Sequence, residues 1–235
     1  MTDLDARTKA KREAGFAAVD RHVRSDMVVG LGTGSTAIWA IRRVGELLAA
    51  RVLSGVNAVP TSTASADEAR ACGVPVTTLD QHPRLAVTID GADEVAPNLD
   101  LIKGGGGAHL REKVVAQASH RLIIVVDEAK LVPVLGAAFA VPVEVITMAA
   151  RPERDYLERL GAAVTLRTTP AGEPFVTDEG NWILDASFGP IKDPRTLLDV
   201  LHERAGIVEV GLFLGLTSEV LVAGPGGVRA LTPES

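Results

Sequence analysis

Cysteine is nearly absent from this chain of 235 residues, which has a single one at position 72. A lone Cys72 cannot form an internal disulfide and does not indicate a cysteine-based zinc site. Long hydrophobic runs are also lacking, because the longest nearly apolar stretch, residues 208–216, contains Glu209 and is too short to cross a bilayer. The charged residues after Met1 lack the apolar core of a signal peptide. We therefore expect a cytoplasmic protein with no membrane partner.

Basic residues are fewer than acidic ones, 24 against 30, which gives a formal net charge of −6 at pH 7. This balance argues against a nucleic-acid partner, although it leaves room for a local basic pocket. Apolar residues make up 46% of the chain and charged residues 23%, values that are typical of globular proteins and exclude a disordered chain. A chain of this length forms one large domain or two small ones.

Short apolar runs alternate with amphipathic stretches in the first half of the sequence. The periodicity predicts strands over residues 27–31, 56–59, 74–77, 85–89, 99–102 and 122–126. It predicts helices over residues 9–23, 38–48, 64–71 and 109–118. Such an alternation indicates an α/β fold built around a mostly parallel sheet.

The pattern changes after about residue 131, where prolines punctuate shorter elements. Residues 175–184 are expected to form a hairpin, because its turn, residues 178–181, is rich in residues that tolerate positive φ. Helices are expected on either side of the hairpin, over residues 153–160 and 195–204.

These differences predict two domains. Residues 132–205 are expected to form a smaller α+β insertion, and residues 1–131 with 206–235 the main domain. In this prediction the strand-like tail from Ile207 returns to the sheet of the main domain.

The first candidate site is the loop Gly32-Thr33-Gly34-Ser35-Thr36, between a predicted strand and a predicted helix. Its glycines allow close backbone approach, and the N–H groups at a helix start attract an anion. A tight turn with Ser35 or Thr36 as the N-cap explains the same residues equally well. The third glycine of a dinucleotide fingerprint is missing, and so is the Gly-Lys-Ser/Thr of a P-loop. The functional interpretation that survives is a small phosphate site.

The second candidate is Asp90-Gly91-Ala92-Asp93, directly after the predicted strand 85–89. Ligands of open parallel sheets bind beyond the carboxyl ends of the strands, where both acids should lie. Asx turns, caps or a solvated acidic loop explain the two residues as well when they are taken alone. The spacing fits no calcium loop.

The third candidate is Lys103 with the glycines that follow it, Gly104 to Gly107, here called the glycine loop. Backbone N–H groups beside a cation suit a developing oxyanion. Glu112 is expected early in the next helix, where the alternative is an exposed acid stabilised by the helix dipole. Lys130 follows a strong predicted strand, but a solvated lysine explains it equally well.

Together these loops indicate one chemistry, because the three of them follow predicted strands and parallel strands present such loops at one edge of a sheet. The residues of these loops suit removal of a proton from the carbon next to the carbonyl of a phosphorylated sugar. They also supply hydrogen-bond donors for the enediolate that forms. A positioned base contributes about 10²–10⁴-fold to such a reaction. The 5 histidines are scattered, are expected at the surface or in caps, and indicate no metal site.

Six motifs in order carry a resemblance to a known family. They are Gly30-Leu-Gly-Thr-Gly-Ser-Thr36, Asp90-Gly-Ala-Asp-Glu94, Lys103-Gly-Gly-Gly-Gly-Ala-His-Leu-Arg-Glu-Lys113, Val141-Pro-Val-Glu-Val145, Val176-Thr-Asp-Glu-Gly-Asn181 and Val210-Gly-Leu-Phe213. The set resembles ribose-5-phosphate isomerase, type A, over nearly the whole chain. The resemblance implies a Rossmann-like domain with an inserted ferredoxin-like α+β domain that lies at an oligomer interface. It also implies interconversion of ribose 5-phosphate and ribulose 5-phosphate without metal or cofactor, in a homodimer or homotetramer.

The resemblance also implies residue roles. Glu112 would be the base, Lys103 and Asp90 would handle the oxygens of the enediolate with the glycine amides, and Asp93 would assist ring opening. No role is carried onto His109, which lies where the family varies. The implied substrate-binding residues are Lys11, Thr33, Gly34, Ser35, Thr36, Gly91, Ala92, Gly104, Gly105, Gly106 and Lys130, with the two lysines chiefly on the phosphate.

Two other functions remain open from the sequence. One is a sugar-phosphate sensor on the same fold, although the stretch before the first strand is too short for a helix-turn-helix. The other is acyl or CoA transfer through a glutamate nucleophile, an analogy of fold alone. The retained acids and Lys103 favour the isomerase.

Overall fold

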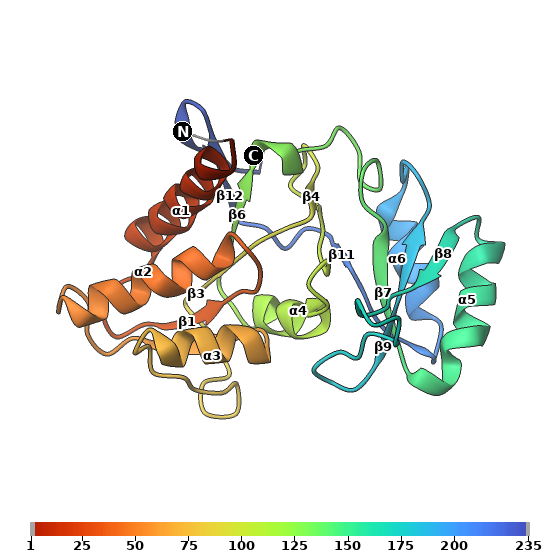
Figure 1. Ribbon diagram of the computed structural model, residues 1–235, viewed down its shortest axis with the longest axis horizontal. Helices are drawn as coiled ribbons and strands as arrows, with labels where there is room; N and C mark the ends of the chain where they lie inside the picture. The colour runs from red at the N-terminus through yellow and green to blue at the C-terminus, as the bar shows by residue number, and fades with distance from the viewer. Residues whose placement is uncertain (1–2, 234–235) are drawn as a thin grey trace. The chain divides into compact units, whose positions relative to one another are not determined.

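The computed structural model describes residues 3–233, and for residues 3–7 it describes the backbone alone. The chain divides into two compact units (Figure 1). The first unit contains residues up to 92, residues 111–130 and residues from 216 onward, and the second contains residues 93–110 and 131–215. No helix within residues 3–233 is long and apolar enough to span a membrane.

A six-stranded sheet forms the centre of the first unit, in the order β13-β12-β6-β3-β1-β2. Neighbouring strands are parallel except at the edge, where β13 runs antiparallel to β12. The mostly parallel sheet predicted from the alternation is therefore confirmed. The strands are β1 (Val28–Leu31), β2 (Asn57–Pro60), β3 (Val87–Asp90), β6 (Leu122–Asp127), β12 (Glu219–Gly224) and β13 (Gly227–Leu231).

Helices α1, α2 and α3 lie one beside the next in this unit (Figure 1). Their bounds are Asp3–His22, Ala37–Ala49 and Thr63–Ala71. The unit also contains α4 (His109–Gln117) from Arg111 onward and the 3₁₀ turn η1 (Glu128–Lys130). Helix α2 buries Ala37, Ile41 and Val44 because residues three and four apart share one face of a helix. Every residue of β6 is buried, as expected for an inner parallel strand covered on both faces.

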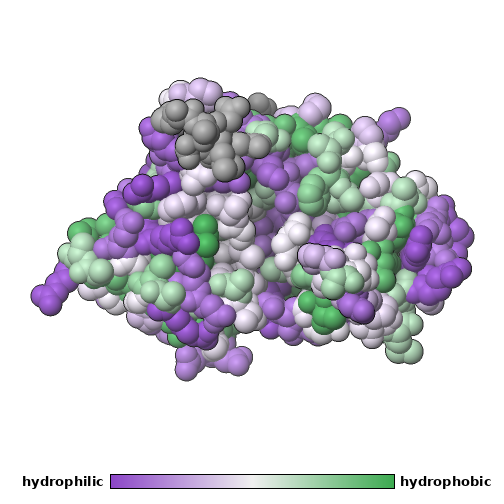
Figure 2. All heavy atoms as spheres, in the orientation of Figure 1, coloured by the Kyte–Doolittle hydropathy of each residue, from purple (hydrophilic) through white to green (hydrophobic). Residues whose placement is uncertain are grey.

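The second unit contains two antiparallel sheets, with orders β10-β7-β9-β8 and β11-β5-β4. Its helix α5 buries Glu153 and Leu157 and turns most of its charged side chains outward, which Figure 2 shows as the hydrophilic surface over α5. The strands are β4 (Glu94–Val95), β5 (Leu101–Ile102), β7 (Val141–Val145), β8 (Ala163–Leu166), β9 (Trp182–Ser187), β10 (Ile207–Val210) and β11 (Leu212–Phe213). The helices are η2 (Thr147–Ala149), α5 (Ala150–Arg159) and α6 (Pro194–His202).

Two strand predictions are wrong. Residues 74–77 make a single bridge, from Val76 to Ala58, because Pro75 has no N–H to donate to a ladder. The predicted hairpin over 175–184 does not form, since β9 pairs with β7 and β8 instead. The N–H of Thr177 is used within the turn itself, where it donates to the carbonyl of Asn181 over 2.9 Å.

The chain returns to the first sheet later than Ile207, the position that the sequence predicts. Strand β10, which starts at Ile207, pairs with β7 in the second unit, and the chain joins the six-stranded sheet only at β12. The predicted insertion, 132–205, lies wholly within the second unit, which also includes residues 93–110 and 206–215. These additions follow from pairing, because β11 holds β5 and β5 holds β4.

Candidate active site

The carboxylate of Asp90 is fixed by the backbone at the carboxyl end of the parallel sheet. Strands β1 and β3 are neighbours, with Leu31 opposite Ile89, so the residues after both strands meet at one edge. The N–H groups of Thr33 and Gly91 donate to Oδ1 of Asp90 over 3.1 and 2.7 Å. Asp90 is 1% exposed, and a Cβ at Gly32 would overlap its carboxylate. The first and second candidate loops therefore meet, as predicted for Asp90.

The loop 32–36 uses its hydroxyl groups away from helix capping. Thr36 occupies the N-cap position of α2, but its side chain makes no capping hydrogen bond to the described residues. Ser35 Oγ accepts a hydrogen bond from Nζ of Lys11 in α1 over 2.8 Å. Gly34 has φ +111°, a conformation that side-chain-bearing residues rarely adopt. Lys11 and the loop thus present a cation and a hydroxyl together, two groups that can both bind an anion.

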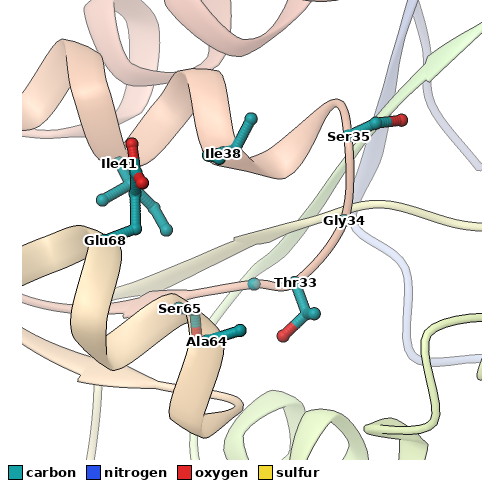
Figure 3. A pocket seen from close by; sticks show the side chains of 9 residues that line it. Thr33, Gly34, Ser35, Ile38, Ile41, Ala64, Ser65 and Glu68 are labelled. Carbon is teal, nitrogen blue, oxygen red and sulfur yellow. The ribbon is translucent and has the colours of Figure 1, made fainter.

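A cavity of about 370 Å³ opens beside this loop, between α2 and α3 (Figure 3). Thr33 lines it, and its hydroxyl bonds to Thr61 and Ser62 over 2.9 and 2.7 Å at the start of α3. Figure 3 shows Ser35 pointing away from α3. Glu68 lines the cavity with a negative charge that pairs with Arg42 over 2.6 Å. Because a carboxylate repels anions, the side of Lys11 and Ser35 suits an anion better than the side of Glu68.

The third candidate loop does not follow a strand of the parallel sheet, contrary to the prediction. Lys103 follows β5, which belongs to the three-stranded antiparallel sheet of the second unit. Its backbone N–H donates to the carbonyl of Gly211 over 2.9 Å, and its Nζ lies 5.4 Å from the centre of the Phe213 ring. Lys103 is 2% exposed, and the ring face stabilises a cation that water reaches poorly.

Asp93 and the glycine loop are joined within the second unit. The N–H of Gly105 donates to Oδ2 of Asp93 over 2.7 Å. Gly104 has φ +108°, and the N–H of Gly107 closes a turn onto its carbonyl over 2.9 Å. The loop therefore has a defined conformation that aims a backbone donor at a carboxylate, and it is not a flexible linker.

Glu112 lies in the first turn of α4 and is 5% exposed. This burial excludes the alternative of an exposed acid at a helix start. A carboxylate removed from water is costly unless polar groups surround it, which makes a buried acid a feature of functional sites. Lys130 ends η1, directly after β6, and is half-buried.

The predicted site residues are thus divided between the two units. The first unit holds Lys11, Thr33, Gly34, Ser35, Thr36, Asp90, Gly91, Ala92, Glu112 and Lys130, and the second holds Asp93, Lys103, Gly104, Gly105 and Gly106. Within residues 3–233, no group of three or more histidine, cysteine, aspartate or glutamate side chains is arranged to hold a metal ion.

Comparison with known proteins identifies the family. The family model for ribose 5-phosphate isomerase A (phosphoriboisomerase A) matches residues 57–227. This chain belongs to that family. It is 50% identical to ribose-5-phosphate isomerase A of Chloroflexus aurantiacus, over 96% of this chain and 94% of the relative.

Solved structures of the isomerase family have the same fold. Ribose 5-phosphate isomerase from Plasmodium falciparum is 38% identical, with a TM-score of 0.93 over 97% of this chain and 100% of that chain. A D-ribose-5-phosphate isomerase in complex with phospho-erythronic acid is 37% identical, with a TM-score of 0.92 over 95% of this chain and 98% of that chain. The family predicted from the ordered motifs is confirmed.

The structure adds polar residues to this isomerase fold that sequence reasoning missed. Thr61 and Ser62 bond to Thr33, and their place after β2 was a signal that could have found them. Arg167 donates to the carbonyls of Gly104 and Gly105 over 2.7 and 3.2 Å, a contact for which the sequence gives no signal.

Buried carboxylates in the second unit were missed as well. Glu94 accepts hydrogen bonds from the N–H groups of residues 136, 138 and 139 over 2.6, 2.6 and 2.7 Å. His109 is fully buried, against the expectation of a surface or capping histidine, and its Nε2 lies 3.9 Å from Oε2 of Glu144. Burial raises the pKa of Glu144, and hydrogen bonds from Asn181 and Thr177 partly offset that rise.

Proposed function

We propose that this chain interconverts D-ribose 5-phosphate and D-ribulose 5-phosphate by moving one proton between C2 and C1 of the open-chain sugar. The observation that carries the proposal is the 50% identity, over 96% of the chain, to ribose-5-phosphate isomerase A of Chloroflexus aurantiacus. The residues expected to perform the chemistry, Asp90, Asp93, Lys103 and Glu112, are all present.

Glu112 is the base in this proposal. Its carboxylate removes the proton from C2 of the aldose, the electron pair forms the C1–C2 double bond of an enediolate, and the same proton then returns to C1. The burial of Glu112, at 5% exposed, supports the role because it limits exchange of that proton with water. A positioned base contributes about 10²–10⁴-fold.

The negative charge of the enediolate develops on the oxygens of C1 and C2. Lys103, Asp90 and the N–H groups of the glycine loop exchange protons and hydrogen bonds with these oxygens. The burial of Lys103, at 2% exposed, supports the role because a cation interacts more strongly with an oxyanion where water is scarce. Asp93, which Gly105 holds through its N–H, assists opening of the furanose ring.

The phosphate is bound by Lys11, Ser35 and Thr36 with help from Lys130. The bond between Lys11 and Ser35 supports this assignment because both groups can turn toward an anion that enters. The remaining substrate contacts come from Thr33, Gly34, Gly91, Ala92, Gly104, Gly105 and Gly106.

The test is the variant Glu112→Gln, which keeps the size of the side chain but cannot take a proton. We expect kcat for ribose 5-phosphate to fall by roughly 10²-fold or more with KM little changed. Glu158→Gln, at a half-exposed acid of α5 that pairs with Arg154, is the matched control and should keep wild-type kcat. Wild-type turnover by Glu112→Gln would refute the base. A wild-type protein that binds ribose 5-phosphate without turnover would favour the sugar-phosphate sensor.

The proposal also covers the cellular location, cofactor use and assembly of the protein. The chain works in the cytoplasm, without a cofactor, as a homodimer or homotetramer in which residues 132–205 contribute to the interface. Exposed apolar side chains in the second unit support such an interface, with Met148 86% and Val176 56% exposed. Light scattering after size exclusion tests the assembly, and a monomer at every concentration would contradict it.

A further inference from the structure

The glycine loop lacks side chains that could fix its own conformation. Glycine populates many backbone conformations, and four of them in a row would sample a broad range in isolation. An oxyanion site needs its donors aimed before the substrate arrives, since reorganisation during the reaction raises the barrier. Besides the turn that Gly107 closes onto Gly104, contacts from outside the loop must therefore hold it.

Arg167 supplies such contacts from the end of β8. Its Nη1 donates to the carbonyls of Gly104 and Gly105 over 2.7 and 3.2 Å. Its Nε and Nη2 donate to the two carboxylate oxygens of Asp185 on β9 over 3.0 and 2.5 Å. All three guanidinium nitrogens are thus used, and the Asp185 fork fixes the plane of the group.

The backbone of Arg167 is held as firmly as its side chain. Its N–H donates to the carbonyl of Ile183, and its carbonyl accepts from the N–H of Phe175, each over 2.9 Å. Phe175 also limits the loop, because a Cβ at Gly107 would meet its ring. The side chain of Arg167 is 14% exposed, so water competes weakly for its hydrogen bonds.

A contact that fixes the carbonyl of one residue also fixes the direction of the N–H of the next residue. In a planar trans peptide the C=O of one residue and the N–H of the next point in opposite directions, and every peptide bond in the described part of the chain is trans. With the carbonyl of Gly104 turned to Arg167, the N–H of Gly105 points the other way, where it meets Asp93. By the same geometry the carbonyl of Gly105 directs the N–H of Gly106 away from Arg167.

We propose that Arg167 is a positioning residue of the isomerase, which holds two carbonyls of the glycine loop so that the N–H groups of Gly105 and Gly106 face Asp93 and the substrate oxygens. This inference rests on the proposed function. The positive charge adds a second effect, because a carbonyl that accepts from a cation polarises its peptide and strengthens the N–H as a donor.

The experiment is the variant Arg167→Gln, whose shorter neutral side chain cannot hold Asp185 and both carbonyls together. We expect kcat to fall roughly tenfold to a hundredfold with KM little changed, because misaimed donors weaken the transition state more than the bound substrate. Hydrogen exchange followed by mass spectrometry should show faster exchange over residues 103–110 than in the wild type.

The matched control is Arg204→Gln. Arg204 makes the same kind of two-point pair in the second unit, with Glu153 over 2.9 and 3.1 Å, and no hydrogen bond recorded for Arg204 in the described structure reaches the glycine loop. It should lose stability while keeping wild-type kcat and wild-type exchange over residues 103–110. An equal loss of kcat in both variants would show that Arg167 has only a structural role, and it would overturn the inference.

Three further outcomes are decisive. Wild-type kcat in Arg167→Gln, or unchanged exchange over residues 103–110, would overturn the inference. Absence of isomerase activity in the wild type would refute the proposed function instead, while the exchange data would still report whether Arg167 holds the loop. If Arg167→Gln fails to fold, Arg167→Lys replaces it with the same expectations, because lysine keeps the charge but lacks the planar fork.

Discussion

Carboxylates in this chain differ in what holds them. Backbone N–H groups hold the buried Asp90 and Glu94 and the partly buried Asp93. Side chains of Thr177 and Asn181 hold the buried Glu144. Burial raises the pKa of Glu144, and these hydrogen bonds only partly offset the rise.

The pH dependence of stability should report Glu144. Its pKa is raised from the ordinary value of 4.5, chiefly by burial, so the folded protein holds this proton more tightly than the unfolded chain does. The stabilisation is fully present below the unfolded pKa and is lost as the pH rises through the folded pKa. Glu144→Gln resembles the protonated state, so its free energy of unfolding relative to wild type should rise from acidic to neutral pH.

Urea titrations of both proteins at several pH values measure this difference. Asn181 and Thr177 donate to Oε1, an atom that glutamine retains, so the comparison isolates the charge. A difference that stays constant with pH would show that the charge of Glu144 costs the fold nothing.

At the scale of elements, the start of α3 joins a helix cap to the loop 32–36. Ser62 forms a capping box with Ser65 and also bonds to the hydroxyl of Thr33. Ser62 therefore stabilises both the start of α3 and the loop 32–36, to which the proposed function assigns the phosphate.

Ser62→Ala should lower the free energy of unfolding by about 1 kcal/mol, the usual loss for an N-cap. It should also raise KM for ribose 5-phosphate, because Thr33 loses a partner next to the phosphate-binding residues. Asp193→Ala is the matched control, since Asp193 caps α6 through Thr196 in the second unit. Urea titration and steady-state kinetics measure both effects, and an unchanged KM in Ser62→Ala would remove the cap from the substrate loop.

At the scale of the whole molecule, the proposed proton transfer uses only acids, a lysine and backbone amides of this chain. No step of that proposal needs a metal ion, so we expect isomerase activity to depend on no divalent cation.

Dialysis against EDTA, followed by the ribose 5-phosphate assay in EDTA, should leave kcat and KM unchanged. Thermal unfolding before and after dialysis provides the control for an indirect effect on stability. Activity that is lost in EDTA and recovered with Mg²⁺ or Mn²⁺ would contradict the proposed proton-transfer mechanism.

Much of the fold could be predicted because its signals are local. The wholly apolar run 122–126 predicted an inner strand, and Ile41 and Val44 of the predicted apolar stripe are buried on α2. Ile38 of the same stripe is half-buried and lines the cavity. The prediction failed where the structure of a segment depends on the strand with which it pairs. Pro75 limits 74–77 to a bridge, and β10 joins β7 although its sequence suits either sheet.

The candidate site was predictable in composition and less so in geometry. Adjacent parallel strands β1 and β3 bring Thr33 to Asp90, which follows from their shared edge. Lys103 was assigned to the same sheet on equal grounds, yet the two residues of β5 pair with β4 and β11. A two-residue strand carries too little periodicity to reveal its partners.

The sequence alone determined the fold class and the family, because these depend on residue type, order and short-range period. The tertiary structure decided which groups hold others in place. Arg167 reaches Gly104 across 63 positions of the chain, and Glu94 reaches Ala138 across 44. Such contacts exist only after β8, β9 and the small sheet have formed, so their energy is set by the topology and leaves no local trace in the amino-acid order.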